Sequence, residues 1–309
     1  MALLYLSTPE RAAIWRPIFA RELPGLQFIE GAQAVTDPSA VRYVAAWTAP
    51  DDLAEVYPNM ELLLSVGAGV DQFDFSRFPE RIKIVRMVTP SIREMMRDYV
   101  TLGVMAMHRH LHHYVAQQRE QRWIAGRVEL ARQKRVGVMG MGQLGSAAIE
   151  ALRPFGFELR AWARSVHDVE DVETFAGPEG LRHFLARTDI LVCLLPLTPD
   201  TRNILNADLF AALPQGACLV HAGRGAHLDQ DALLSALDSG YLGGAFLDVV
   251  EPEPLPKNHP FWSHPAIFIT PHIATITDFQ EGAYCAVESI RHHERGTRIP
   301  GLVSRKRGY

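Results

Sequence analysis

The chain has 309 residues, of which 48% are hydrophobic, and a formal net charge of -4 at pH 7. A chain of this length exceeds what one hydrophobic core usually organises, so two domains are expected. The charge balance gives no basic footprint for nucleic acid or an anionic membrane, and no apolar run is long enough to span a bilayer, so we expect a cytoplasmic protein with a small-molecule partner.

The N-terminal third predicts a small, flavodoxin-like α/β domain. Apolar runs at residues 3–6, 43–47, 62–66 and 82–85 have the length and composition of strands. Residues 282–292 have helical character but belong to a segment too short for its own core, so we expect that segment to pack on this domain. The predicted substrate domain is therefore 1–97 with 276–309, and residues 98–275 form a dinucleotide-binding domain, with a cleft between the two.

Small residues follow one strand of the predicted substrate domain. The backbone N–H groups of Val66, Gly67, Ala68 and Gly69 could form a nest for the carboxylate of a substrate, although a simple tight loop is the alternative. Trp47 ends another candidate strand and could wall the same pocket, although a single aromatic side chain more often belongs to the core.

Four histidines, His108, His110, His112 and His113, lie close together in a helical segment. His108 and His112 are one helical turn apart, a spacing that metal-binding helices use. No nearby set of acids and histidines completes a first shell with an open position, so we predict no metal site. We interpret the cluster as a polar helix face near a domain or subunit boundary.

From Arg135 onward, apolar runs alternate with helical segments, which predicts a Rossmann-type, doubly wound parallel sheet. The candidate strands are residues 136–139, 158–163, 190–195, 218–222, 245–249 and 267–270. Between the first two, apolar residues recur at helical spacing until Pro154 and Gly156 end the pattern.

The first strand-to-helix turn carries a glycine motif with the sequence Gly140-Met141-Gly142-Gln143-Leu144-Gly145. In such a motif the first glycine allows a tight turn, the second lets the backbone approach a pyrophosphate, and the third lets helix and strand pack closely. The start of the helix attracts the anion. Because a strand, a helix and a second strand surround the motif, we predict a dinucleotide site here.

The next strand ends where an acidic residue usually binds the ribose 2′-hydroxyl of NAD. This chain has Arg164 and Ser165 there. A guanidinium cannot accept that hydrogen bond but can bind a 2′-phosphate, so NADP(H) is the preferred cofactor and NAD(H) a possible one. The alternative is a surface arginine at a strand end.

Polar and small residues follow the remaining strands, at the edge of the sheet where ligands bind. They include candidate cofactor residues Leu195, Pro196, Ala222, Gly223 and Asp248, and candidate catalytic residues Arg224, Glu253 and His272. Asp248 could accept a hydrogen bond from the nicotinamide carboxamide.

An arginine, an acid and a histidine are the residue types that reduction of a 2-keto acid needs. Arg224 can hold the substrate carboxylate and polarise the carbonyl, while His272 can protonate the oxygen as hydride arrives. A carboxylate beside the histidine favours its protonated form, and Glu253 is the candidate. Each residue alone has another interpretation, as a solvated loop charge or a loop histidine.

Together these motifs resemble the D-isomer-specific 2-hydroxyacid dehydrogenase family over nearly the whole chain. The glycine motif, Leu195-Pro196-Leu197-Thr198, Arg224-Gly225, Asp248 through Glu253, and Pro271-His272-Ile273-Ala274 occur in the family's order. The short length, Arg164, Trp47 and the C-terminal Arg307-Gly308-Tyr309 are similar to its glyoxylate/hydroxypyruvate reductase A subgroup.

The resemblance implies NADPH-dependent reduction of a small 2-keto acid by a cytoplasmic homodimer. It also implies that Arg224 anchors the substrate and that His272 with Glu253 forms the proton-donor pair. Many relatives carry asparagine where this chain has His221.

Two other functions remain open. Formate dehydrogenases share the fold but pair a glutamine with the histidine, and Glu253 counts against them. Nucleotide-sensing corepressors retain the catalytic residue types, but a short chain without a basic surface favours the enzyme.

Overall fold

The computed structural model describes residues 1–308, and Tyr309, the last residue of the C-terminal segment noted above, lies outside the described residues. The chain divides into two compact units, Met1–Ile92 with the segment from Ile276 onward, and Arg93–Thr275. Each unit is built on a parallel sheet, of five strands in the first and seven in the second. The predicted fold class of two α/β domains is confirmed.

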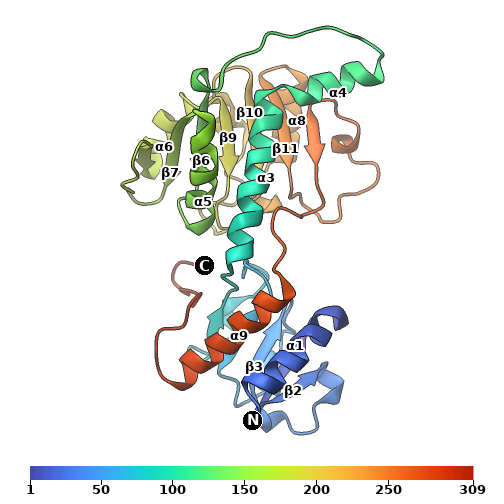
Figure 1. The fold of residues 1–309 in the computed structure, drawn as a ribbon, viewed down its shortest axis with the longest axis vertical. Coiled ribbons are helices and arrows are strands. Elements are labelled where there is room, and N and C mark those ends of the chain that lie inside the picture. Colours follow the sequence, from blue (N-terminus) through green and yellow to red (C-terminus); the bar gives the residue numbers. More distant parts are fainter. Residues whose placement is uncertain (309) are drawn as a thin grey trace. The chain divides into compact units, whose positions relative to one another are not determined.

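The first unit holds a sheet with the strand order β2-β1-β3-β4-β5 (Figure 1). Its strands are β1 (Ala2–Leu6), β2 (Gln27–Glu30), β3 (Val41–Ala46), β4 (Leu62–Ser65) and β5 (Lys83–Val85), and its helices are α1 (Pro9–Glu22), α2 (Leu53–Val56) and α9 (Phe279–Glu294). β1 and β4 are almost continuously buried, as expected for parallel strands covered on both faces. Helices α1 and α9 pack side by side.

The second unit holds a sheet with the order β12-β11-β10-β9-β6-β7-β8. Its strands are β6 (Arg135–Met139), β7 (Glu158–Ala163), β8 (Glu173–Ala176), β9 (Ile190–Cys193), β10 (Ala217–His221), β11 (Leu242–Leu247) and β12 (Ile267–Ile269). Its helices are α3 (Pro90–His108, whose first residues belong to the other unit), α4 (Leu111–Arg119), α5 (Gln143–Leu152), α6 (Gly177–Leu185), α7 (Ala207–Ala211) and α8 (Gln230–Asp238). The strand order reverses between β6 and β9, which is where dinucleotides bind in such sheets.

Helices cover both faces of the seven-stranded sheet (Figure 1). On one face, Val100 and Val104 of α3 and Ala148 of α5 join the buried side chains of the strands. On the other face, Phe184 of α6 and Leu233 of α8 do the same. Because both faces are buried, the strands are rigid supports for the loops at their carboxyl ends.

Two strands of the structure, β2 and β8, are not among the predicted ones. Both lie at the edge of a sheet and are only partly buried, so their apolar signal is weak. The helical pairing of His108 with His112 is wrong, because α3 ends at His108 and His110 has φ 52°, in the left-handed region. The two histidines therefore lie on different helices.

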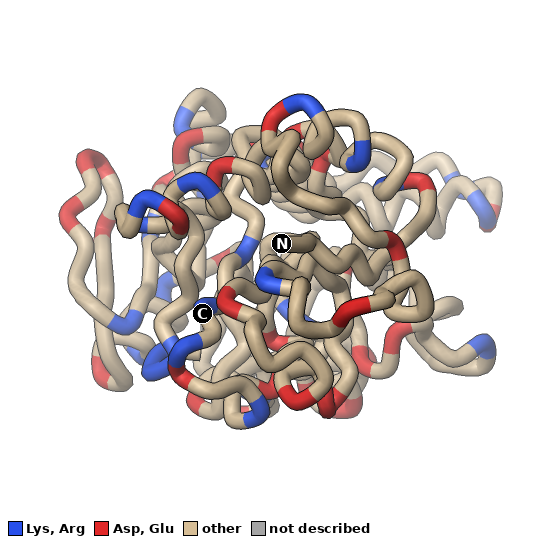
Figure 2. The backbone as a smooth tube through the Cα atoms, turned by 90° about the horizontal axis from the view of Figure 1, so that it is seen from below, with Lys and Arg blue, Asp and Glu red and all other residues tan. Residues whose placement is uncertain are grey.

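Charged residues of both signs are scattered over the chain (Figure 2). No helix within residues 1–308 is long and apolar enough to cross a membrane. The three cysteines are free, with Cys193 and Cys218 buried and Cys285 partly buried.

Candidate active site

The turn between β6 and α5 is shaped by its glycines. Gly140 has a φ of +103°, which L side chains rarely adopt, and a Cβ there would lie 2.9 Å from the carbonyl oxygen of Leu194. A Cβ on Gly145 would lie 1.7 Å from the carbonyl oxygen of Gly140, so no side chain fits. Around Gly142, in contrast, no atom of residues 1–308 lies within 4 Å of a Cβ position. Two glycines let the chain turn and pack, and the third leaves open space.

Helix α5 begins at this open space. Its N-cap is Gly142, which as a glycine has no side chain to hydrogen-bond to the first amides of the helix. Met141 is buried, Leu144 packs on the core, and Gln143 is exposed. An uncapped helix start leaves amide donors and the positive end of the helix dipole for an anion. The arrangement is therefore suited to a pyrophosphate.

The end of β7 carries a cation and a hydroxyl in place of an acid. Arg164 and Ser165 follow Ala163 directly, and both are exposed. Arg160, within the same strand, is fully buried and paired with Glu173 across 3.0 Å. Arg164 is therefore the arginine of this strand region whose position allows contact with a ligand.

The backbone after β9 and β10 is held by hydrogen bonds. The Thr201 hydroxyl donates to the Pro196 carbonyl over 2.7 Å, and Leu195 beside it is buried. The Ala222 amide donates to the Cys193 carbonyl over 3.2 Å. These contacts fix the candidate cofactor residues Leu195, Pro196, Ala222 and Gly223 at the edge of the sheet.

Two buried histidines hold the backbone of Arg224. Nε2 of His221 lies 2.8 Å from the Arg224 carbonyl oxygen and donates to it. The Arg224 amide donates over 3.0 Å to Nδ1 of His227, so the ring proton of His227 is on Nε2, which lies 3.3 Å from the Pro196 carbonyl. Both rings are fully buried. The Arg224 main chain is therefore fixed on its amide and on its carbonyl.

Burial lowers the pKa of His221 from its ordinary value of 6.5 to about 3, and the neighbouring His227 adds to this shift. The ring is therefore neutral at physiological pH. Its Nδ1 has no hydrogen-bond partner within residues 1–308. A protonated ring would be a buried charge beside Arg224, which the site disfavours.

His272 and Glu253 form a close pair. Nδ1 of His272 lies 2.7 Å from Oε2 of Glu253, and the other oxygen of Glu253 accepts a hydrogen bond from the Val250 amide over 3.2 Å. His272 has φ 55°, in the left-handed region that non-glycine residues rarely occupy. Nε2 of His272 has no partner within residues 1–308 and is the nitrogen left for a ligand. Both side chains are about one-third exposed, at 35% and 37%.

The carboxylate of Asp248 holds the loop that carries His272. One oxygen accepts from the Thr270 hydroxyl over 2.7 Å and from the Ile273 amide over 2.8 Å, and the other accepts from the Ala274 amide over 2.8 Å. The Asp248 carbonyl accepts from the His272 amide over 2.9 Å. Asp248 is buried, and these contacts position His272, while its expected contact with the cofactor stays a prediction.

The loop after β4 is held by the buried hydroxyl of Ser65. This hydroxyl accepts from the Gly67 amide over 3.2 Å and donates to the Gly69 carbonyl over 2.8 Å. A Cβ on Gly67 would lie 2.7 Å from the ring of Trp47, which packs on the loop while 45% exposed. The amides of Ala68 and Gly69 have no acceptor within residues 1–308.

The predicted residues thus fall into two groups. In the unit of Arg93–Thr275, the predicted cofactor and catalytic residues follow the carboxyl ends of β6, β7, β9, β10, β11 and β12, at one edge of the sheet. In the other unit, Trp47 and the loop of residues 66–69 follow the carboxyl ends of β3 and β4.

Three positioning residues were not predicted from the sequence. His227 supports Arg224, while Thr270 and Tyr99, whose hydroxyls lie 2.6 Å apart, extend the contacts of Asp248. His227 lies three residues after Arg224, and Thr270 ends a predicted strand, so their neighbourhood was a weak signal. Tyr99 of α3 is distant in the sequence from Asp248 and Thr270, so nothing in the sequence pointed to it.

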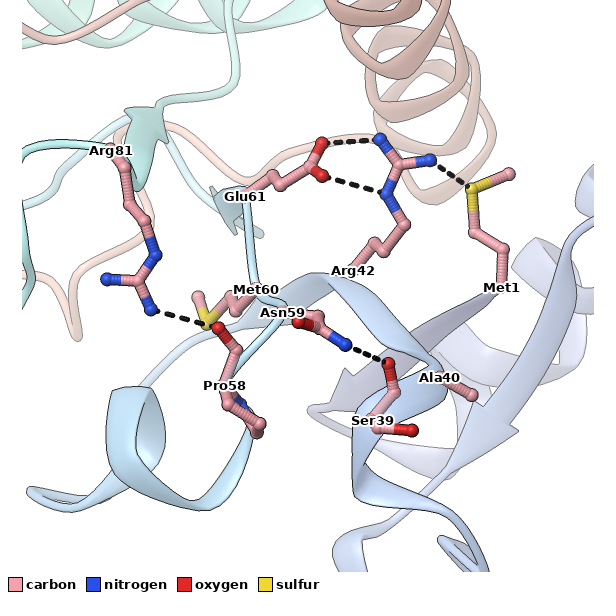
Figure 3. Close-up of a pocket in the computed structure, with 9 residues that line it drawn as sticks. All are labelled: Met1, Ser39, Ala40, Arg42, Pro58, Asn59, Met60, Glu61 and Arg81. Atoms are coloured by element: carbon pink, nitrogen blue, oxygen red, sulfur yellow. Dashed lines mark hydrogen bonds and ion pairs between the residues drawn. The ribbon is translucent and has the colours of Figure 1, made fainter.

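A pocket of about 460 Å³ lies at the amino ends of β3 and β4 (Figure 3). Arg42 and Glu61 pair across it over 2.9 and 2.6 Å, and Arg81 donates to the Pro58 carbonyl over 3.0 Å. No predicted site residue lines this pocket, and its arginines are already engaged. We therefore assign it no part in the reaction.

Residues 102–274 match the model of a family described as D-isomer specific 2-hydroxyacid dehydrogenase, NAD binding domain. The chain is 35% identical over 315 aligned positions to glyoxylate/hydroxypyruvate reductase A of Citrobacter koseri, with 100% of both chains covered. It is 34% identical to the protein of the same name from Yersinia enterocolitica, over 96% of each chain.

Two solved structures are similar over the whole chain. The D-isomer specific 2-hydroxyacid dehydrogenase of Xanthobacter autotrophicus Py2, in complex with NADPH and MES, has a TM-score of 0.93 and 37% identity, covering 100% of this chain and 99% of that chain. The NADPH-dependent glyoxylate/hydroxypyruvate reductase of Sinorhizobium meliloti, in complex with NADP and sulfate, has a TM-score of 0.91 and 34% identity, with the same coverage.

The buried His221 predicts a specific sensitivity to acid. Between pH 6.5 and about 3, the unfolded chain binds a proton at this residue and the folded chain does not, so stability falls as the pH falls through this window. We expect His221→Asn to reduce this loss, by at most about 1.4 kcal/mol per pH unit. Urea unfolding of parent and variant at about pH 7 and about pH 4.5 measures the difference.

His183→Asn, which changes an exposed histidine of α6, is the matched control and should leave the acid sensitivity at the parent level. Equal losses of stability in the parent and in His221→Asn would contradict the assignment.

Proposed function

The chain belongs to the D-isomer-specific 2-hydroxyacid dehydrogenase family, and on this premise we propose that it reduces a small 2-keto acid, of the glyoxylate or hydroxypyruvate type, to the 2-hydroxy acid with NADPH. The observation that carries the proposal is the pairing of His272 with Glu253 over 2.7 Å, at the sheet edge that also carries the glycine turn. The relatives matched over their full length are named as reductases, so the corepressor alternative finds no support.

The carboxyl edge of the seven-stranded sheet is suited to the cofactor. The open space at Gly142 and the uncapped start of α5 fit a pyrophosphate, and Arg164 with Ser165 fits a 2′-phosphate. The backbone around Leu195, Pro196, Ala222 and Gly223 lines the remaining edge. NADPH supplies the hydride when bound. NAD(H) is expected to be used less well, because no carboxylate follows Ala163 to accept its ribose hydroxyl. Relatives with bound NADPH and NADP support this preference.

His272 is the proposed proton donor. Glu253 occupies Nδ1, so Nε2 carries the proton that passes to the keto oxygen as hydride reaches the carbonyl carbon. The carboxylate contacts Nδ1, and its bond to the Val250 amide keeps it in place. The loop held by Asp248 fixes the direction of the ring. The keto oxygen thus receives its proton from His272, so the reaction neither consumes a hydronium ion nor releases a hydroxide ion at the site.

Arg224 is the proposed substrate anchor. Its backbone is fixed by His221 and His227, and one guanidinium nitrogen donates to the Gly223 carbonyl over 2.8 Å. A guanidinium has five N–H donors in a planar fork and can bind a carboxylate through two of them. The positive charge also polarises the substrate carbonyl.

The loop of residues 66–69 and Trp47 are the proposed substrate residues of the other unit. Two neighbouring amides, of Ala68 and Gly69, lack acceptors within residues 1–308 and suit an anionic oxygen. The ring of Trp47 supports the loop at Gly67. We assign these residues a role in substrate selectivity, and none in the proton or hydride steps.

We further propose that the protein is a homodimer. The segment from α4 to β6 exposes a group of large apolar side chains: Leu111, Tyr114, Trp123, Ile124, Val128 and Leu130. Trp123 is 100% exposed. Isolated apolar side chains are ordinary, but six exposed ones within residues 111–130 favour an interaction surface on this segment. A cytoplasmic location is also proposed, on the family resemblance alone.

Arg164 should decide the preference for NADPH. We expect Arg164→Ala to raise the KM for NADPH about 10- to 100-fold, because a charge-assisted contact with the 2′-phosphate is lost, and to leave the KM for NADH nearly unchanged. Steady-state kinetics with both cofactors measures this, and Arg182→Ala, an exposed arginine of α6, serves as the control. Equal increases of the KM for NADPH and for NADH would show that Arg164 does not contact the 2′-phosphate.

Substitutions of the proposed catalytic residues should change kcat and KM in different ways. His272→Ala should lower kcat by about 100- to 10,000-fold while NADPH binding survives, because only proton transfer is lost. Arg224→Ala should raise the KM for the keto acid as well as lower kcat, and Arg224→Lys should restore little, because lysine lacks the planar fork. Near-normal turnover in His272→Ala would show that the roles are misassigned.

Glu253→Gln should change the pH dependence of the reaction. Keto-acid reduction takes up one proton through the proposed donor His272, so its rate depends on pH, and replacing the carboxylate at Nδ1 by a neutral amide should displace this dependence. The measurement is kcat against pH for the parent and for Glu253→Gln. A profile that does not move would show that Glu253 does not act through the histidine.

The exposed Trp123 gives a test of the dimer. We expect Trp123→Ser to weaken association, seen as a shift toward the monomer mass on dilution in light scattering, because apolar area buried at an interface drives association. Val166→Ser, at a 79% exposed position after β7, is the control. A parent protein that is monomeric at all concentrations would end the proposal.

A further inference from the structure

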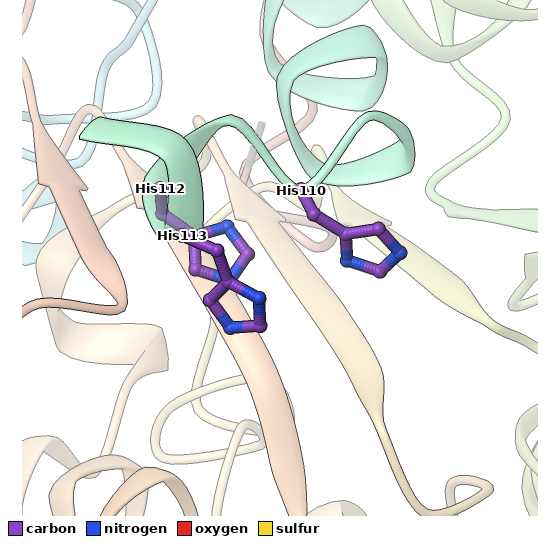
Figure 4. A group of neighbouring side chains, drawn as sticks. All are labelled: His110, His112 and His113. Carbon is purple, nitrogen blue, oxygen red and sulfur yellow. The ribbon is translucent and has the colours of Figure 1, made fainter. Parts of the chain in front are cut away.

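The corner between α3 and α4 gathers three histidines on one side of the chain (Figure 4). His110 lies between the two helices with φ 52° and ψ 39°, in the left-handed region, and His112 and His113 follow in the first turn of α4. In a continuous helix only His110 and His113 would share a face, whereas here the rings of His112 and His113 also lie close together. His108 is not part of the group, because its ring packs edge-on against Phe157, with the centroids 5.1 Å apart.

The rings are close enough to share an ion. One ring nitrogen from each of His110, His112 and His113 lies within 4.8 Å of the others. The ring centroids of His112 and His113 are 4.1 Å apart, and those of His110 and His113 are 5.8 Å apart. Nitrogens that bind one zinc ion at about 2.1 Å each can be at most about 4.2 Å apart, so a small rotation of the rings completes the site.

His112 supplies an independent observation. Its side chain is 1% exposed, and the Gly243 backbone is the hydrogen-bonding group that faces its ring within residues 1–308, so at least one ring nitrogen has no partner there. A buried polar group without a partner is unfavourable and needs an explanation. The ring rests against β11, where a Cβ on Gly244 would lie 3.1 Å from it. An ion bound to one ring nitrogen would satisfy a group that is otherwise unpaired.

We propose that His110, His112 and His113 form a binding site for a divalent late transition-metal ion of the Zn²⁺ type. Zinc, nickel and copper ions bind well to imidazole ligands, whereas magnesium and calcium ions prefer oxygen ligands. The His113 side chain is exposed and the His110 side chain partly exposed, and neither ring has a side-chain hydrogen bond to break within residues 1–308. The carboxylate of Glu129, paired with Lys134 over 2.6 Å, is the acidic group facing His110.

The site departs from the interpretation of the sequence, in which these histidines formed a polar helix face. That interpretation assumed one continuous helix, and the left-handed residue at position 110 removes the assumption. Because His112 rests on β11, an ion at this corner ties the α3–α4 connection to the seven-stranded sheet. Its role is to stabilise the fold, and the hydride and proton steps do not involve it.

The test uses the full-length protein, without a histidine tag and stripped of metal by a chelator. Calorimetric titration with Zn²⁺ should give one ion per chain, and Co²⁺ should give the visible absorption of a site rich in nitrogen ligands. Zn²⁺ at about 100 times its Kd should lower the unfolded fraction about 100-fold, whereas Mg²⁺ should not.

His113→Ala is the main variant because its side chain is exposed and its loss leaves the core intact. It should weaken Zn²⁺ binding by about 10-fold or more and remove the Co²⁺ absorption, while keto-acid turnover stays at the parent level. His110→Asn, which keeps a residue type that tolerates the left-handed conformation, should do the same.

His183→Ala, the exposed histidine of α6, is the matched control and should bind Zn²⁺ like the parent. The proposal is overturned if the parent shows no saturable binding of one ion per chain. It is also overturned if the Zn²⁺ affinity of His113→Ala stays within about 3-fold of that of His183→Ala.

Discussion

The geometry of the candidate catalytic edge of the seven-stranded sheet depends on the carboxylate of Asp248. This side chain is 2% exposed, and a buried charge is tolerated only when donors surround it. The Thr270 hydroxyl and the amides of Ile273 and Ala274 provide those donors. Hydrogen bonds to a charged group contribute about 1.5–3 kcal/mol each, so the loop that carries His272 has one strongly favoured conformation. The left-handed backbone of His272 and its contact with Glu253 both follow from this anchoring.

The other loops of the same edge are fixed by different means. At the glycine turn, the close approach of Gly145 to the Gly140 carbonyl leaves one arrangement of helix and strand. At Arg224, two neutral histidines bind the main chain from both sides. In each case the anchoring groups are buried and the chemical groups are exposed or partly exposed. Such separation allows an active site to be arranged before its ligands arrive, which lowers the cost of ordering it during the reaction.

The sequence predicted the strands that are buried on both faces, because their apolar runs are unbroken, and it failed at β2 and β8, where burial is partial. Strand ends identified Arg224, Glu253 and His272 as candidates, since parallel strands share one carboxyl edge. The sequence did not predict which atoms hold them. The support from His227 and the inward turn of Asp248 depend on hydrogen bonds between loops, which residue types and spacing do not encode.

The clamp on Arg224 acts only through main-chain atoms, and this has a consequence for how the protein can change. Any residue other than proline at position 224 would present the same amide and carbonyl to His227 and His221, so these two contacts do not depend on the guanidinium. The role that we propose for the guanidinium, binding of an anionic group, is therefore separate from these two contacts of the main chain. Descendants of this chain can exchange the side chain and acquire different substrates without first losing the loop, and a protein engineer can use the same freedom.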